Sequence, residues 1–442
     1  MAFHAQKSLQ AYAGVSLAIL SLINLFNYLD RYLVSALFES LKHSELALTD
    51  LKLGFLMTSF LVVYMLTAPI FGALGDRGSR PRLIAFGVGC WSLATSLSGF
   101  AGSYLSLLAA RAAVGVGEAA YGTIAPSLLA DYFPKSGRGR VMAIFFCAIP
   151  VGSALGYVFG GLMDTHFGWR AAFFVAGIPG MALAVLCLKL RDPPRGAQDG
   201  PAAPLAASPP LAPARTVHAM APTPAAPLAT PAPPSPLATY RKLLTNKPYV
   251  LTVLGYAAYT FAVGGLASWM PAFLERVRGM PRAQATVSFG AIVVITGFIG
   301  TFAGGWLGDY CAKYSRSAYL WLSAASTLLA APFAWGALTT ASPTLYWIWM
   351  VIAELCLFLS TGPVNAASVN LVSPTMRASA IALQVFAIHL LGDVVSPPLI
   401  GALSDVASLA EAVKIVPLAV LVAGVVWCFA AYSSQVTGRG PD

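Results

Sequence analysis

The chain has 442 residues, of which 57% are hydrophobic and 10% are charged, and its mean hydropathy is +0.72. Soluble domains carry about 25% charged residues. The composition therefore excludes a soluble enzyme, a disordered protein and a nucleic-acid-binding domain, and predicts a multi-pass protein of the cell's inner membrane. The net charge of +10 fits this interpretation, because Lys and Arg gather in the cytoplasmic loops of membrane proteins.

Apolar runs predict twelve transmembrane helices, since each crossing needs about 20 apolar residues. The first six begin near Gly14, Leu53, Leu83, Ser103, Val141 and Ala171, and the second six near Tyr249, Ala283, Ser317, Thr344, Met376 and Ala412. We therefore expect an all-α membrane protein with two pseudo-symmetric six-helix bundles, residues 1–190 and 247–442.

The segment between the two sixes, residues 191–246, has a different composition. Fourteen of the 31 prolines fall between Pro193 and Pro236, interleaved with Ala and Ser. Such a segment cannot pack a core, so it is predicted to be a disordered linker. A ligand for proline-binding domains is the alternative.

Loop charges set the predicted orientation. Eighteen of the 27 Lys and Arg residues fall on the side that holds the linker and both chain ends. By the positive-inside rule, both termini and the linker are expected in the cytoplasm, which requires an even number of spans in each half.

An internal repeat follows the second span of each half. The first copy runs from Gly72 to Arg82 and contains Gly-Asp76-Arg77. The second begins at Gly304 and ends in Gly-Asp309-Tyr310. The same element at the same place in both halves indicates a duplicated architecture.

The first copy resembles the signature loop of the major facilitator superfamily, and six plus six spans with a central linker match that family's architecture. Three further segments, 27–32, 114–126 and 389–397, resemble the Spinster group, whose animal members move lysophospholipids and sphingosine-1-phosphate. The resemblance, with the Ala-rich composition and compact loops, points to a bacterial relative of that group.

The resemblance also implies a gating role for the signature loop, which holds the cytoplasmic ends of the two halves together in outward-facing members. Carried over, Gly72 allows close helix approach, Asp76 caps a helix of the second half, and Arg77 pairs with Asp131. The second copy has Tyr310 after Asp309 in place of an arginine, so the predicted latch is asymmetric.

Ionisable residues inside spans are costly and often functional. Asp30 and Arg31 lie deep in the first span, and Arg111 and Glu118 lie two turns apart on nearly one face of the fourth. Glu118 can pair with Arg31 or take up a proton. A purely structural ion pair is the alternative. Asp30 is the expected proton carrier, with Glu118 as the second candidate.

The expected substrate contacts are Arg31, Arg111, Asn27, Tyr121, His389 and Asp393. His389 and Asp393 stand at i, i+4 and can interact. Glu354 is a lone carboxylate in the tenth span, ranked below Asp30. An amphipathic lipid with an anionic head suits arginines beside apolar walls.

Other functions remain open at this stage. The chain can instead carry a small organic anion, a sugar acid or a drug, and a pore or receptor is the alternative outside transport. No enzyme motif is present, and the six cysteines show neither CxxC spacing nor a His partner at metal spacing. We expect no enzyme activity, no cofactor and no metal. The expected partners are the bilayer, protons and the substrate, bound by a monomer.

Overall fold

The computed structural model describes residues 2–133, 138–198, 236–315, 317–373 and 376–437, and within those ranges every regular element is helical. The first half contains α1 (Ala2–Ala36), α2 (Phe38–His43), α3 (Asp50–Arg77), α4 (Arg80–Ser98), α5 (Tyr104–Tyr132), α6 (Arg138–Phe167) and α7 (Trp169–Cys187). The second contains α8 (Pro236–Thr245), α9 (Lys247–Arg276), α10 (Arg282–Ala312), α11 (Ala318–Thr339), α12 (Pro343–Asn370), α13 (Arg377–Ile388), the π-helix η2 (His389–Asp393), α14 (Ser396–Val406), α15 (Leu409–Ala412) and α16 (Ile415–Thr437).

Helix starts follow local capping rules. Ser103 and Ser106 form a capping box at the start of α5, and Asn246 accepts the backbone N–H of Tyr249 at the start of α9. Such contacts satisfy amide groups that have no partner inside a helix. The caps therefore fix where two of the long helices begin.

Ten stretches of the described chain are long and apolar enough to cross a bilayer. One of them runs through α13, η2 and α14, and another through α15 and α16. Helices α4 and α5 lie outside this set, although they have 19 and 29 residues. Both pack against other helices of the first half, α5 against α3 and α4 against α7. The all-helical prediction is confirmed, and the count of twelve spans stays a prediction.

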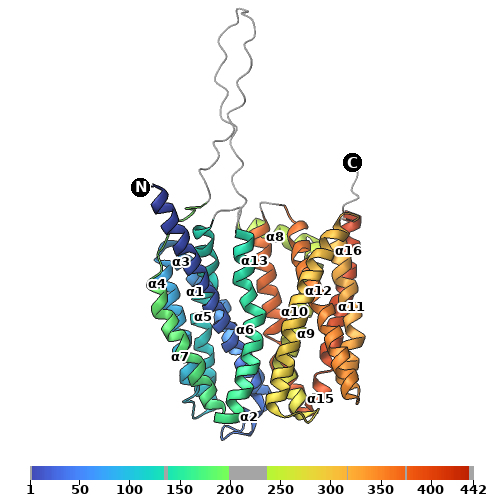
Figure 1. The fold of residues 1–442 in the computed structure, drawn as a ribbon. Helices are drawn as coiled ribbons and strands as arrows, with labels where there is room; N and C mark the ends of the chain where they lie inside the picture. The colour runs from blue at the N-terminus through green and yellow to red at the C-terminus, as the bar shows by residue number, and fades with distance from the viewer. Residues whose placement is uncertain (1, 134–137, 199–235, 316, 374–375, 438–442) are drawn as a thin grey trace, which may run out of the picture.

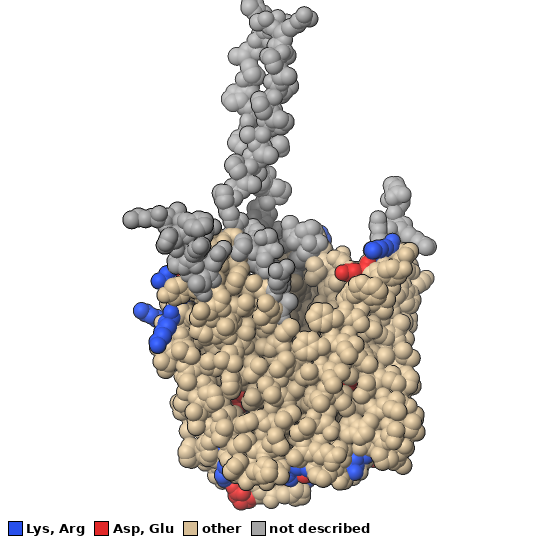
Figure 2. Space-filling model, in the orientation of Figure 1, with Lys and Arg blue, Asp and Glu red and all other residues tan. Residues whose placement is uncertain are grey.

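The helices stand side by side, with those of the first half on one side of the molecule and those of the second half on the other (Figure 1). The start of α1, the ends of α7 and α16, and helix α8 lie on one face, which we call the linker face. The opposite face, called the far face, holds α2 and α15. A broad belt that is almost entirely free of charged residues separates the charged side chains near the two faces in Figure 2, as expected of a membrane-spanning protein.

One glycine brings two helix backbones into direct contact. A Cβ added to Gly115 on α5 would lie 2.9 Å from the backbone nitrogen of Tyr64 on α3 and would overlap the carbonyl of Phe60. The space beside Gly115 between Arg111 and Glu118 is thus filled by the α3 backbone. Residues flanking Gly115 are held firmly against α3 as a result.

Candidate functional site

Two arginine–carboxylate pairs lie inside the first half. Nη2 of Arg31 on α1 donates to Oε2 of Glu118 on α5 at 2.6 Å. Nη1 of Arg111 on α5 lies 3.3 Å from Oδ1 of Asp30 on α1. The predicted Arg31–Glu118 pairing is confirmed, and α1 and α5 are joined by two crossed ion pairs.

The cation that pairs with Asp30 is Arg111, and not its sequence neighbour Arg31. Consecutive helix residues point about 100° apart, so Asp30 and Arg31 meet different partners. Thr95 on α4 also donates to Asp30 at 2.7 Å. Asp30 is 3% exposed and Arg111 is fully buried, so this pair is sealed inside the helix bundle.

The Arg31 pair differs because it reaches a cavity. Arg31 lines a small cavity between the halves, together with Tyr32 from α1 and Asp393 from η2. Its guanidinium also lies 4.8 Å from the ring centre of Tyr28 and 5.0 Å from that of Phe60. Buried Glu118 has one oxygen, Oε1, with no hydrogen-bond partner. Arg31 therefore lies between a deeply buried carboxylate and a space that a ligand can enter.

Two other residues expected to bind substrate do not line the small cavity that Arg31 borders. Asn27 is 4% exposed, and its Nδ2 has no hydrogen-bond partner. Tyr121 is 1% exposed, donates to the carbonyl of Leu20 at 2.6 Å and packs edge-on against Trp91. Tyr121 thus ties α5 to α1 in the core of the first half and does not line the small cavity.

His389 and Asp393 form the expected i, i+4 contact, with 3.0 Å between Nδ1 of the imidazole and each carboxylate oxygen. They are the first and last residues of η2, where the N–H of Val394 reaches the carbonyl of His389 at 3.1 Å. π-Helical turns are rare and frequent at functional sites. This turn places Asp393 in the same small cavity as Arg31.

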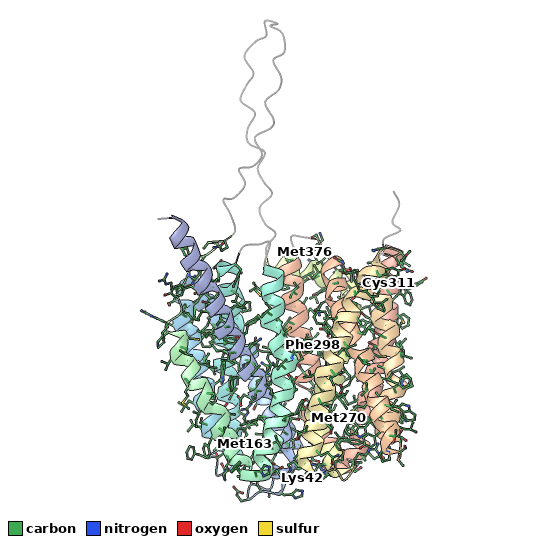
Figure 3. All side chains as sticks on the ribbon, viewed as in Figure 1. Lys42, Met163, Met270, Phe298, Cys311 and Met376 are labelled. Carbon is green, nitrogen blue, oxygen red and sulfur yellow. The ribbon has the colours of Figure 1, made fainter. Side chains whose placement is uncertain are left out.

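A larger cavity of about 580 Å³ lies between the halves, with residues of α1, α6, α9, α10 and α12 in its walls. Phe298, one of the residues in its lining, stands about midway between the two faces in Figure 3. Nine of its lining residues are aromatic: Tyr32, Phe146, Tyr157, Tyr256, Tyr259, Phe289, Phe298, Phe302 and Phe358. Such a wall suits an apolar or amphipathic ligand.

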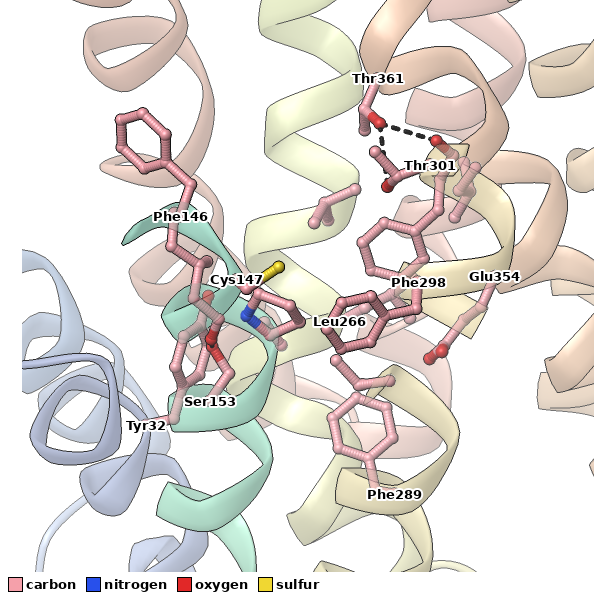
Figure 4. Close-up of a pocket in the computed structure, with 18 of the residues that line it drawn as sticks. Tyr32, Phe146, Cys147, Ser153, Leu266, Phe289, Phe298, Thr301, Glu354 and Thr361 are labelled. Atoms are coloured by element: carbon pink, nitrogen blue, oxygen red, sulfur yellow. Dashed lines mark hydrogen bonds between the residues drawn. The ribbon is translucent and has the colours of Figure 1, made fainter. Parts of the chain in front are cut away.

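Glu354 on α12 is the one Asp, Glu, Lys, Arg or His in the lining of this cavity. Figure 4 shows it on the wall that also carries Phe289 and Phe298. The sequence singled out Glu354 as a lone carboxylate in its span and ranked it below Asp30, but it did not indicate that Glu354 lines a cavity. Helices α10 and α12 pack against each other in the fold, and a single sequence does not show this contact.

The linker face holds the predicted gating residues. Asp76 and Arg77 at the end of α3 are exposed, and within the described ranges neither has an ion-pair partner. Asp309 accepts from the hydroxyl of Tyr319 at 2.9 Å. A Cβ added to Gly72 would meet no atom within 4 Å, so the close helix approach expected there is absent from this conformation.

The partner of Asp131 is Arg80, and the expected pairing with Arg77 is wrong. Nη1 of Arg80 lies 2.5 Å from Oδ2 of Asp131, and its Nε lies 2.8 Å from Oδ1 of Asp192. Arg80 begins α4 at the linker face and is buried, with 1% of its surface exposed. Arg77 ends α3 and faces outward, which explains the difference.

The far face carries an ion network that the sequence did not predict. Arg276 at the end of α9 donates to Glu39 on α2 and to Asp50 on α3, both at 2.5 Å. Ser404 on α14 also donates to Asp50 at 2.5 Å. The network joins the two halves through short loops and helix ends, where sequence gives no sign of which charges meet.

Hydrogen bonds between the halves, among the described residues, lie toward the far face. Ser35 and Tyr157 donate to the backbone of α9, and Thr58 donates to the carbonyl of Val394 at 2.8 Å. Thr58 is eight residues, or about 12 Å, from the start of α3. This conformation is therefore closed at the far face, while the large cavity extends toward the linker face.

Comparison with known proteins agrees with this architecture. The Major Facilitator Superfamily matches residues 20–397. The chain is 35% identical to Protein spinster homolog 1 of Homo sapiens, over 90% of this chain and 76% of that protein. It is 32% identical to Protein spinster of Drosophila melanogaster, over 88% of this chain and 62% of that protein.

Two solved structures share the fold. Both are of a bacterial homolog to the human lysosomal transporter Spinster, in inward-facing conformations, and both are 23% identical to this chain. The unoccupied form superposes with a TM-score of 0.81 and covers 98% of this chain and 99% of that one. The occupied form has a TM-score of 0.76, with 97% of each chain covered. This chain belongs to the Major Facilitator Superfamily and is a Spinster-like membrane transporter.

Proposed function

We propose that this protein is a proton-coupled secondary transporter of an amphipathic lipid with an anionic head, such as a lysophospholipid or a sphingosine-phosphate-like lipid. Transport proceeds by alternating access between two six-helix bundles. The observation that carries the proposal is the position of Arg31, shared between buried Glu118 and a cavity between the halves.

Proton binding and substrate binding meet at this arginine. While Glu118 is ionised, it holds Arg31 through a charge-assisted hydrogen bond. Protonation of Glu118 removes that charge and frees the guanidinium for an anionic head in the cavity. A substrate bound to Arg31 equally favours the protonated carboxyl, because coupling between two ligands is reciprocal.

Asp30 acts as the second proton acceptor in this scheme. Its pair with Arg111 is buried on all sides, so Arg111 supports the site without reaching the substrate. Protonation of Asp30 weakens one of the two links between α1 and α5. The two carboxylates together therefore adjust how firmly these helices are joined.

The large cavity favours a lipid over the other substrates. Its lining is mainly aromatic and aliphatic and contains one carboxylate, whereas a sugar acid needs many hydrogen-bonding groups. A small aromatic drug fits such walls as well and is the second candidate. A pore or receptor does not use the conformational change that a half-closed structure and a signature loop imply.

The signature loop gates the linker face. When the bundles rock together there, Gly72 allows a helix of the second half to approach, and Asp76 and Arg77 find partners across the gap, with Asp309 contributing from the second copy. The Arg80–Asp131 pair anchors α4 to α5 beside this loop. The linker face, with both chain ends, lies in the cytoplasm of a monomer with twelve spans.

Proteoliposome uptake tests the coupling. Asp30→Asn and Glu118→Gln should each abolish uptake driven by a pH gradient while the protein still binds the lipid. Glu118→Gln should bind it at least as tightly as the unmodified protein does, because the carboxylate that competes for Arg31 is neutral. Glu411→Gln, which removes an exposed carboxylate of α15, is the matched control and should transport normally. Unchanged pH dependence in both variants would show that these pairs are structural.

Orientation has its own test. A reporter that is active only in the periplasm, fused after residue 442, should be inactive. Activity of that reporter would contradict the cytoplasmic placement of the linker face and an even number of spans.

A further inference from the structure

Helix α8 has one apolar face that is buried in the protein and a second that is exposed. Leu243 is fully buried, in a cluster with Tyr249 on α9 and Ala380 on α13. Tyr240 and Leu244 stand one turn apart beside this buried face and are 38% and 63% exposed. The ten-residue helix is therefore anchored in the second half by one face, while the neighbouring apolar face stays open.

Basic residues occupy the remaining surface of α8. Consecutive residues of an α-helix are about 100° apart, so Arg241 lies nearly opposite Leu243, between Leu244 and Lys242. Arg241 and Lys242 are exposed, as is Lys247 at the start of α9. The described residues provide no ion-pair partner for any of these three cations. Going round the helix, a buried face is thus followed by an exposed apolar face and then by a basic one.

The elements around α8 supply no carboxylate at this face. The sequence contains no Asp or Glu between Asp199 and Glu275, and Glu275 is at the far-face end of α9. Helix α13, which also packs against α8, has no acidic residue along its length. The positive charge of α8 is therefore not balanced by its neighbours, and an anionic partner complements it.

The position of α8 decides which anionic partner can reach it. The helix lies at the linker face, and only Asn246 separates it from α9 (Figure 1). Since α9 is long and apolar enough to cross the bilayer, this short connection holds α8 at the membrane surface. Helices that lie in the membrane interface have apolar side chains toward the acyl chains and basic residues on the polar face, and tyrosine is enriched at that depth.

We propose that α8 is a binding site for anionic phospholipids of the leaflet at the linker face. Tyr240 and Leu244 pack against the upper part of the acyl chains. Arg241, Lys242 and Lys247 bind the phosphate. This lipid is a resident of the bilayer, and its site is separate from the cavity in which the transported amphiphile is proposed to bind.

The bound lipid acts on three long helices at once. The side chain of Asn246 donates to the carbonyl of Leu371 at the end of α12 at 2.9 Å, and the hydroxyl of Tyr249 donates to the carbonyl of Ala380 on α13 at 2.6 Å. Through these contacts α8 is tied to the linker-face ends of α9, α12 and α13. A lipid held by α8 therefore anchors this corner of the second half to the membrane surface.

Titration of the purified full-length chain with lipids, followed by native mass spectrometry, tests the site. Palmitoyl-oleoyl phosphatidylglycerol and the phosphatidylcholine with the same chains differ in the net charge of the head. The unmodified protein should bind phosphatidylglycerol more tightly, and Arg241→Gln with Lys242→Gln should weaken its tightest binding event about tenfold. As the matched control, Lys189→Gln with Lys313→Gln removes two exposed cations that follow α7 and α10 on the same face. This control should weaken binding less than about threefold.

The depth of the apolar face has its own measurement. A fluorophore at Leu244→Cys, in a background without the six native cysteines, should be quenched by phospholipids that carry bromine on their acyl chains. The same fluorophore at Thr245→Cys is about 100° further round the helix and should be quenched less than half as strongly.

Two results would overturn the proposal. Equal weakening by the two charge-removing pairs would show that only the overall charge of the linker face attracts the lipid. Equal quenching at the two labelled positions would show that the apolar face of α8 does not meet the acyl chains. Either result leaves the proposed transport intact, because neither the Arg31 pair nor the large cavity includes a residue of α8.

Discussion

Gly54 on α3 lies directly against the backbone of Pro397 and Pro398 at the start of α14. A Cβ added to Gly54 would lie 2.5 Å from Cα of Pro398 and would overlap the carbonyl oxygen of Pro397. Backbone atoms cannot rotate away as a side chain can. The closed far face therefore depends on the absence of a side chain at this position.

Gly54→Leu is predicted to open the far face. The side chain wedges α3 from α14, so the conformation closed at the far face loses population to one that is open there. Spin labels at Glu45→Cys and Glu411→Cys, in a background without the six native cysteines, report the separation of the halves. The distance between the labels should lengthen with Gly54→Leu and stay the same with Gly102→Leu, because a Cβ at Gly102 meets no atom within 4 Å.

Gly72→Leu is predicted to have the opposite effect. A Cβ at Gly72 meets nothing within 4 Å in this conformation, so the substitution is tolerated here. It should block closure of the linker face and abolish uptake, with the far-face label distance as short as in the unmodified protein. Normal uptake by Gly72→Leu would show that the signature loop does not close against the second half.

The ion network of the far face is predicted to set the balance between conformations. Arg276→Gln removes the guanidinium that joins Glu39 and Asp50 across the halves. Loss of charge-assisted hydrogen bonds costs about 2 kcal/mol, which shifts the equilibrium about thirtyfold toward the open far face. The same labels measure this shift. Arg195→Gln breaks a pair with Asp192 on the linker face, and a comparable shift in that control would contradict the assignment.

Sequence reasoning was strongest where the membrane itself imposes the pattern. Apolar runs gave the helices, and ionisable residues inside those runs pointed to Asp30, Arg31, Arg111 and Glu118. All four meet in two ion pairs. Such residues are rare in spans because burying a charge in the membrane costs free energy. Those that do occur usually have a structural or functional role.

Pairings between distant segments were harder to predict. The partner of Asp131 is Arg80, the buried first residue of α4, and not Arg77, the exposed last residue of α3. Tyr121 looked like part of a substrate wall, but its helix face turns toward Leu20. The cavity around Glu354 exists only once α10 and α12 are packed together. Side-chain direction and helix packing settle these points, and single-sequence patterns do not encode them.

The Arg31–Glu118 pair is also predicted to stabilise the fold. Arg31→Gln leaves Glu118, which is 1% exposed, without its cation, and removing one partner of a buried pair costs about 3 to 5 kcal/mol. The apparent Tm should fall, and Arg31→Gln with Glu118→Gln should recover part of the loss. Glu45→Gln, which breaks the exposed pair with Arg170, should cost less than about 1 kcal/mol. A double variant no more stable than Arg31→Gln would contradict the pairing.

The last prediction concerns pH and the Asp192 carboxylate, which follows the final helix of the first half. Asp192 accepts the backbone N–H of Arg80 at 2.9 Å, and it also accepts from the Arg80 and Arg195 side chains. Partial burial acts to raise the pKa of Asp192, but the hydrogen bonds and positive charge of Arg80 outweigh it and lower that pKa below its ordinary value.

Because the pKa of Asp192 is lower in the folded protein, its contribution to stability is complete above the ordinary carboxyl pKa of about 3.9 and is lost as pH falls through the lowered value. Between pH 5 and pH 8 the contribution is constant. Asp192→Asn should therefore lower the apparent Tm by the same amount across that range, and the difference from the unmodified protein should shrink only below about pH 4. Uptake by Asp192→Asn should keep its normal pH profile between pH 5 and pH 8. If Asp192→Asn shifts the pH profile of uptake, Asp192 itself carries a coupling proton. The proposed role of Glu118 and Asp30 as proton carriers would then be wrong.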